Sequence, residues 1–226
     1  MPCSASALGL GGALARRFAR EGWRVAAIAR SDDKVRALAD EIGGRGYTAD
    51  VTDADAIRTV LARIRDELGP VHTLLWNVGS GVFGTLDDVD ETGLDRAFDT
   101  NARGLLVAVQ AIVGDLRAAG EGNIVVTGAT ASRRGKPVTT AFAPGKAAQR
   151  SLAEALARQL WPEGIHVALV VVDGVVDLPA TRARMDQPDD FFVSPDAFAD
   201  TVLFLCRQDR RAWTFELEVR PYGERW

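Results

Sequence analysis

Two glycines and a rare lysine are the first residues in this sequence that could do chemistry. Gly9 and Gly11 lead straight into a helical pattern. Glycines at such a point let a phosphate approach the backbone, and a helix N-terminus attracts its charge. A glycine-rich turn before a helix is also often only a turn. Lysine is scarce, because Lys34, Lys136 and Lys146 are the only lysines among 27 basic residues, so the position of each is informative.

An ordered series of polar residues follows the glycines, each at the end of an apolar segment or inside a helical one. Asp50 comes after a short strand-like segment, and Asn77 and Gly79 come after the apolar run VHTLLW. Asn101 lies inside a long helical stretch, and Lys146 opens the next helix. Polar groups at the carboxyl ends of parallel strands are well placed to bind a ligand.

The elements that must position these residues alternate between strand and helix. The strands are predicted at 23–29, 47–49, 71–76, 123–127, 166–172 and 215–219, and the helices at 11–20, 33–42, 53–68, 91–119, 146–161 and 195–206. Thr52 or Asp53 can cap the third of these helices. Apolar strands alternating with helices predict a mostly parallel sheet covered on both faces, a doubly wound α/β fold. The length of 226 residues favours one domain over 1–226, and the longest irregular stretch is predicted at 173–194.

Composition excludes several classes of function. With 27 basic and 31 acidic residues the net charge is −4 and the isoelectric point is near 5.3, which gives no general reason to bind nucleic acid or an anionic membrane. No apolar run approaches the roughly 18 residues of a transmembrane helix, and the N-terminus does not have the pattern of a secretory signal. Two cysteines and two histidines make a poor metal set. We therefore expect a cytoplasmic protein without a metal site.

With these residues in this order, the chain resembles the short-chain dehydrogenase/reductase family over essentially its whole length. The family's TGxxxGxG turn corresponds to residues 4–11, and its acidic residue that holds the adenine corresponds to Asp50. Its NNAG motif falls on residues 76–79, its helix-borne catalytic asparagine on Asn101, and its YxxxK motif on residues 142–146. The resemblance implies a Rossmann fold and hydride transfer between a nicotinamide dinucleotide and a carbonyl or alcohol of unknown identity.

The resemblance also implies which dinucleotide the chain binds. An acidic residue at the end of the second strand accepts the ribose hydroxyls of NAD, whereas Arg30 stands there and its guanidinium suits the phosphate of NADP. NADP is therefore expected over NAD, although Arg30 also fits the description of a solvated surface arginine. The residues expected to contact the cofactor are Gly9, Gly11, Arg30, Asp50, Asn77, Gly79 and Lys146.

The chain departs from the family pattern at the reacting end. Phe142 stands at the position of the family's tyrosine, which exchanges the proton. Ala129 stands at the position of its serine, which hydrogen-bonds the substrate oxygen. Leu178 stands at the position of the family's threonine that contacts the nicotinamide carboxamide. Asn101 and Lys146 remain as the expected catalytic framework, but Lys146 has no phenol to activate.

Two functional readings therefore remain open. One is a divergent oxidoreductase with a different proton donor, for which Thr130, Thr139, Thr140, Asp173 and Asp177 are weak candidates. The other is a catalytically inactive dinucleotide-binding or structural protein that acts through protein partners. The missing hydroxyls favour the second, and the presence of both Asn101 and Lys146 favours the first.

The start of the chain and its assembly give two further expectations. Residues 1–4 are too few for the apolar strand that family members carry before the glycine turn, so the first strand is expected to be truncated or the start assigned too late. The helices at 91–119 and 146–161 correspond to those that pair between family subunits. A homodimer or homotetramer is therefore expected.

Overall fold

The computed structural model describes residues 9–79 and 81–224 and divides the chain into two compact units. The first unit contains the chain up to Thr48, Val172–Arg207 and the chain from Glu218 on; the second contains Ala49–Val171 and Gln208–Leu217. The prediction of one domain over 1–226 stays a prediction. The expected truncated first strand lies outside the described residues.

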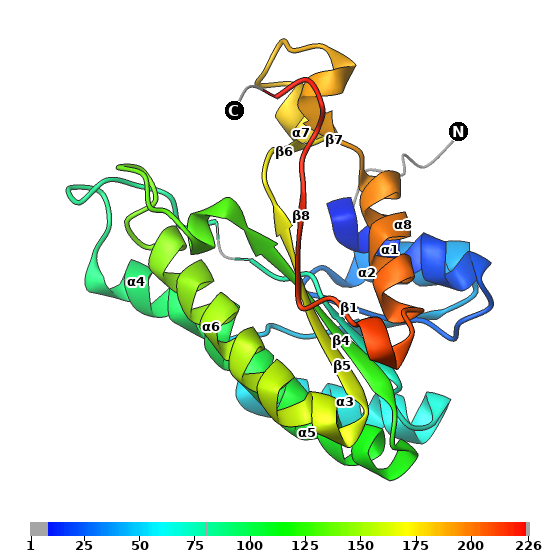
Figure 1. The fold of residues 1–226 in the computed structure, drawn as a ribbon. Helices are drawn as coiled ribbons and strands as arrows, with labels where there is room; N and C mark the ends of the chain where they lie inside the picture. The colour runs from blue at the N-terminus through cyan, green and yellow to red at the C-terminus, as the bar shows by residue number, and fades with distance from the viewer. Residues whose placement is uncertain (1–8, 80, 225–226) are drawn as a thin grey trace. The chain divides into compact units, whose positions relative to one another are not determined.

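The second unit carries most of a four-stranded sheet and the long helices of the fold (Figure 1). The strands follow the order β3-β4-β5-β8, and β3 pairs with β4 in parallel. Its elements are α3 (Ala54–Leu68), β3 (Thr73–Trp76), α4 (Glu91–Phe98), the π-helical turn η1 (Asp99–Arg103), α5 (Gly104–Ala119), β4 (Gly122–Ala129), α6 (Phe142–Leu160), β5 (Ile165–Val172) and β8 (Glu216–Val219), with the 3-10 turns η2 (Thr130–Ser132), η3 (Trp161–Glu163) and η5 (Arg210–Ala212).

The first unit has shorter strands. Strands β1 and β2 form a parallel pair, and β6 and β7 form another. Helix α1 packs against α8. The elements are α1 (Gly9–Arg20), β1 (Ala26–Ala29), α2 (Asp32–Ile42), β2 (Arg45–Thr48), β6 (Val175–Val176), α7 (Pro179–Arg182), the 3-10 turn η4 (Asp189–Phe191), β7 (Phe192–Val193) and α8 (Pro195–Cys206).

Local sequence explains why these elements begin and end where they do. The Asp53 side chain accepts hydrogen bonds from the backbone N–H groups of Asp55 and Ala56, so it is the N-cap of α3. Ser194 caps α8, with Pro195 at the first helical position. Strand β5 is an almost unbroken apolar run and is buried along its length, as expected for a central strand of a parallel sheet.

The predicted α/β fold is confirmed, with three local differences. The helix predicted at 91–119 is α4 and α5 joined by the π-helical turn, in which the backbone N–H of Gly104 donates to the Asp99 carbonyl five residues earlier. Helix α6 begins at Phe142, so Lys146 lies in its second turn rather than at its start. The stretch predicted as irregular at 173–194 contains β6, α7 and β7, which are too short to give a periodic signal.

Candidate active site

Lys146 is the most constrained polar residue of the predicted site. Its ammonium donates to the backbone carbonyls of Val78 and Thr127, each at 3.1 Å, and to Gln149 Oε1 at 2.9 Å. These three acceptors match the three protons of an ammonium group. Burial lowers the pKa of Lys146 to about 8, because removal from water disfavours the charged form. Lys146 therefore stays mostly cationic at neutral pH.

Asn101 and Gly79 lie next to this ammonium. Asn101 is fully buried in the π-helical turn, and its Nδ2 donates to the Ala97 carbonyl at 2.8 Å. A Cβ on Gly79 would stand 3.5 Å from Lys146 Nζ and 3.9 Å from Asn101 Oδ1. The structure therefore brings together three of the residues that the sequence singled out.

Helix α6 approaches α4 closely because position 145 is glycine. A Cβ on Gly145 would meet the Ala97 carbonyl oxygen at 2.9 Å and Asn101 Nδ2 at 3.1 Å. A side chain there would push α6 away from the turn that carries Asn101. Gly145 precedes Lys146 directly, so the close helix packing and the lysine position depend on the same backbone.

The two positions that depart from the family pattern carry no hydroxyl. Ala129 is the last residue of β4, and Phe142 is the first residue of α6. The Phe142 ring packs against Phe83, with 4.7 Å between ring centroids. No proton donor is present at either position, so any proton exchange must use another group.

Two of the three threonines named as substitutes, Thr139 and Thr140, bind their own loop. Thr139 Oγ1 donates to the Lys136 carbonyl at 2.9 Å and accepts from the Lys136 N–H at 2.8 Å. Thr140 Oγ1 donates to the Pro137 carbonyl at 3.2 Å. Ser132, which the sequence analysis did not single out, has a buried hydroxyl without a hydrogen-bond partner within residues 9–79 and 81–224.

The two aspartates named as possible acids are ion-paired in the first unit. Arg182 donates to both oxygens of Asp177, at 2.7 and 2.8 Å, and these bonds lower the pKa of that carboxyl group. Asp173 forms an ion pair with Arg220. An acid role for Asp177 needs a raised pKa, whereas the pKa of this carboxyl group is lowered. The prediction that Asp177 could act as the acid is therefore wrong.

Asp50 and Asn77 lie in turns that follow β2 and β3, respectively. Asp50 is exposed, and its Oδ1 accepts from the backbone N–H of Thr52 at 2.9 Å and from the Thr52 hydroxyl at 2.8 Å. Asn77 directly follows β3, and its backbone N–H donates to the Leu75 carbonyl at 3.1 Å. These turns place both residues beyond strand ends, where the sequence predicted them.

The remaining candidates, Gly9, Gly11 and Arg30, belong to the first unit. Gly9 begins α1 with φ +56°, a left-handed conformation that favours glycine, and its missing Cβ would stand 3.5 Å from a Leu178 methyl group. Gly11 lies inside α1. Arg30 follows β1 directly, is exposed, and has no ion pair within the described part of the chain. Residues 4–8 of the glycine turn lie outside the described residues.

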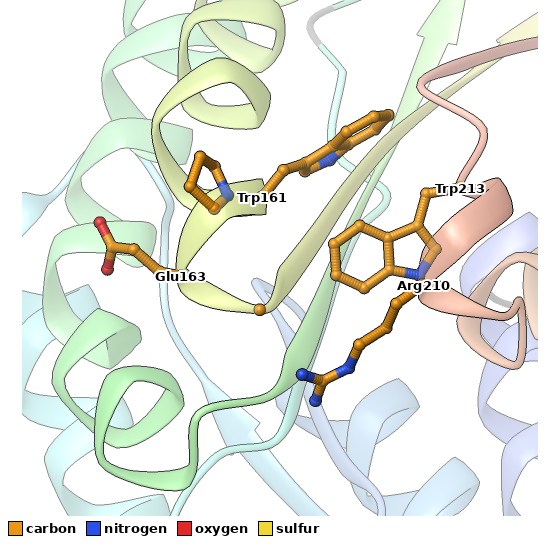
Figure 2. Close-up of a pocket in the computed structure, with 6 residues that line it drawn as sticks. Trp161, Glu163, Arg210 and Trp213 are labelled. Atoms are coloured by element: carbon orange, nitrogen blue, oxygen red, sulfur yellow. The ribbon is translucent and has the colours of Figure 1, made fainter.

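A separate cavity lies beyond the other end of α6 (Figure 2). It measures about 430 Å³ and is lined by Trp161, Pro162, Glu163, Gly164, Arg210 and Trp213. Figure 2 shows the Trp213 indole beside the Arg210 side chain. Trp213 also stacks on His166, with ring centroids 4.8 Å apart. Because α6 rises about 1.5 Å per residue, Trp161 and Lys146 are separated by about 20 Å along the helix, so this cavity is remote from the predicted site.

Two structural features are absent from the described residues. None of their helices has the length and apolar character that crossing a membrane requires. Within residues 9–79 and 81–224 no cluster of three or more histidine, cysteine, aspartate or glutamate side chains is arranged to hold a metal ion.

Comparisons with known proteins agree with this fold. The family model described as short chain dehydrogenase matches residues 4–189. Oxidoreductase UcpA of Salmonella typhimurium is 32% identical over 190 residues, which cover 80% of this chain and 72% of that protein. The solved structure of a short-chain dehydrogenase from Rhodopseudomonas palustris is 31% identical, covers 96% of both chains and has a TM-score of 0.80.

A further solved structure contains a dinucleotide. It is a metagenomic short-chain oxidoreductase in complex with NADP, which is 26% identical to this chain. Its TM-score is 0.80, and the match covers 96% of this chain and 93% of that one. The family match spans most of the sequence, and the fold and the motif order agree with it. The chain therefore belongs to the short-chain dehydrogenase family.

Proposed function

We propose that this chain is an oxidoreductase that transfers hydride between NADP(H) and a small carbonyl or alcohol substrate. The observation that carries the proposal is the buried Lys146 ammonium beside Gly79 and Asn101. A buried cation without a carboxylate partner is costly and favours a functional role. Relatives named as oxidoreductases or dehydrogenases support the same reaction type.

The second unit has groups that fit the two nucleoside portions of a dinucleotide. Gly79 leaves the space beside Lys146 Nζ free of a side chain, so a ribose could approach the ammonium there. Lys146 would then donate to a ribose hydroxyl in place of one of its two backbone carbonyl acceptors. Asp50, Asn77 and Gly79 would contact the adenosine and ribose portions. These roles follow from the family motif positions at which the residues stand.

The first unit has groups that fit the phosphates. Gly9 begins α1 in a conformation that favours glycine, and Gly11 follows it within the first turn. Glycines at a helix N-terminus let a phosphate approach the backbone. Arg30 offers an exposed guanidinium after β1. A guanidinium donates paired hydrogen bonds to a phosphate, which favours NADP over NAD.

The residues of the chain prepare the reaction but do not include the usual proton donor. A bound nicotinamide would supply or accept the hydride. Lys146 would orient the ribose, and the Asn101 side chain would fasten the π-helical turn to the end of α4 through the Ala97 carbonyl. Phe142 has no exchangeable proton, so the proton must come from the substrate, from water or from a side chain other than residue 142.

Dinucleotide binding tests the proposal. Calorimetric titration of the wild-type chain should show NADPH binding more tightly than NADH. Arg30→Asp should reverse this order, with roughly a tenfold or larger loss of NADPH affinity, because a carboxylate repels the phosphate. Lys146→Met should lower the affinity for both NADPH and NADH.

A matched control separates local from general charge effects. Arg24→Asp makes the same charge change at an exposed position near the other end of β1 and should leave the preference for NADPH unchanged. Absence of binding by either cofactor would remove the cofactor assignment. Binding without turnover of any carbonyl or alcohol would favour a catalytically inactive dinucleotide-binding protein.

A further inference from the structure

Gln149 is a buried polar residue that neither the motifs nor the proposed function uses. It lies on α6 three residues after Lys146, on the same face of the helix, and none of it is exposed. A buried amide needs partners for both its carbonyl and its amino group, or it costs stability. Its position is therefore defined by what it contacts.

Both ends of the Gln149 amide are hydrogen-bonded. Gln149 Oε1 accepts from Lys146 Nζ at 2.9 Å, and Gln149 Nε2 donates to the backbone carbonyl of Asn101 at 3.2 Å. The Gln149 side chain thus bridges the ammonium on α6 and the π-helical turn η1. The orientation of the amide follows from the network, because an ammonium can only donate.

Gln149 is also the one side chain among the three acceptors of the Lys146 ammonium. The other two are backbone carbonyls of Val78 and Thr127, which no substitution at those positions removes. No carboxylate within the described residues pairs with Lys146. Phe142 supplies no oxygen one turn earlier, so Gln149 is the only side-chain acceptor of the ammonium among residues 9–79 and 81–224.

We propose that Gln149 is a positioning residue that fixes the Lys146 ammonium by tying it to the Asn101 carbonyl. The bridge holds the lysine head group in one place although position 142 carries no phenol. Its importance for catalysis rests on the proposed function, in which Lys146 orients the dinucleotide ribose. The bridge itself requires no cofactor and is tested without one.

The scarcity of lysine makes the test direct. The chain carries three lysines, so lysine labelled with ¹³C at the ε-carbon gives three NMR signals, and Lys146→Arg identifies the one from residue 146. The wild-type Lys146 signal should titrate with a midpoint near the pKa of about 8. Loss of a hydrogen bond to a charged group should lower that midpoint to about 7 or below in Gln149→Leu.

The opposite shift is expected when a negative charge replaces the amide. Gln149→Glu places a carboxylate beside the ammonium and should raise the Lys146 midpoint to about 9 or above. This variant decides the question if Gln149→Leu does not fold. Gln110→Leu is the matched control, because Gln110 is exposed on α5, and it should leave the midpoint unchanged.

An unchanged Lys146 midpoint in folded Gln149 variants would overturn the proposal, and so would an equal shift in Gln110→Leu. The outcome is distinguishable from that of the proposed function. Shifted midpoints in a chain that does not bind NADPH would support the bridge and contradict the cofactor assignment. NADPH binding with unshifted midpoints would support the cofactor assignment and contradict the bridge.

Discussion

At the scale of single residues, position 142 determines whether the helix beside Lys146 can deliver a proton. A phenylalanine there packs on Phe83 and has no ionisable group, and Ala129 adds no hydrogen bond to a substrate oxygen. Loss of a positioned proton donor typically costs ~10²–10⁴ in rate, and loss of a donor to the developing oxyanion ~10²–10³. The two losses need not multiply, because they act on the same oxygen.

Restoring both groups should therefore restore activity. We predict that Ala129→Ser with Phe142→Tyr raises the rate of NADPH oxidation with small ketones and diketones by about 100-fold or more over the parent. Each single change should do less, and Phe142→Tyr should do more than Ala129→Ser because it supplies the proton. Steady-state assays of the parent, the two single variants and the double variant measure this.

A control places a phenol close by but in the wrong position. Phe83→Tyr adds a hydroxyl to the ring that contacts Phe142 and should not restore activity. Lys146→Met in the double variant should abolish the gain. Robust activity of the parent that survives both Asn101→Ala and Lys146→Ala would mean that a different acid carries the reaction and that the assigned framework is wrong.

The sequence indicated part of this site and missed part of it. Lys146, Asn101 and Gly79 stand at motif positions, so their proximity could be predicted from motif order alone. Gln149 belongs to no motif, and its signal, a polar residue one turn after Lys146 on the buried helix face, is visible only once the helix face is known. Hydrogen bonds from Arg182 to Asp177 also could not be read from sequence, because the partners of surface charges depend on side-chain placement.

At the scale of elements, one irregular turn positions Asn101 of the proposed catalytic framework. The π-helical turn η1 separates α4 from α5 and carries Asn101. A single extra residue in a helical turn gives no break in the apolar pattern, which explains why 91–119 was predicted as one regular helix. The α4–η1 surface and α6 meet at Gly145, where no side chain fits.

A pair of glycine substitutions tests this helix contact. Gly145→Ala adds a Cβ within 2.9 Å of the Ala97 carbonyl oxygen and should lower the free energy of unfolding by about 1–3 kcal/mol. Gly114→Ala, in α5, meets no atom within 4 Å and should raise it by about 0.5–1 kcal/mol, because alanine is the better helix former. Urea denaturation of both variants measures the change in the free energy of unfolding, which should be negative for Gly145→Ala and positive for Gly114→Ala. A Gly145→Ala variant that is more stable than the wild type would contradict the close packing.

Element boundaries were predictable where local signals are strong. Asp53, one of the two predicted caps, and the helix start predicted at residue 195 both match the structure, because capping chemistry is local. Strands β6 and β7 have two residues each, so no periodicity could indicate them. Their existence depends on pairing between residues distant in sequence, as in Val175 with Phe192.

At the scale of the whole molecule, the surface of the second unit carries apolar groups on its long helices. Leu94 and Phe98 on α4 and Leu106 on α5 remain 36–38% exposed. On α6, Leu156 and Leu160 face the interior, and the exposed face instead carries the small residues Ala147, Ser151 and Ala155. Small side chains let a second helix approach closely, so this face is the better candidate for subunit contact.

The assembly prediction can now be directed at that face. We expect a dimer or tetramer in which α6 meets a second copy of the chain, because a symmetric interface places the same helix on both sides of the axis. Ala155→Glu should convert it to a monomer, since two carboxylates would face each other across a surface that now holds small side chains. Ala62→Glu makes the same change on the exposed face of α3 and should leave the mass unchanged. Light scattering at micromolar concentration distinguishes the states. A wild-type monomer, or an assembly that survives Ala155→Glu, would exclude α6 as the contact.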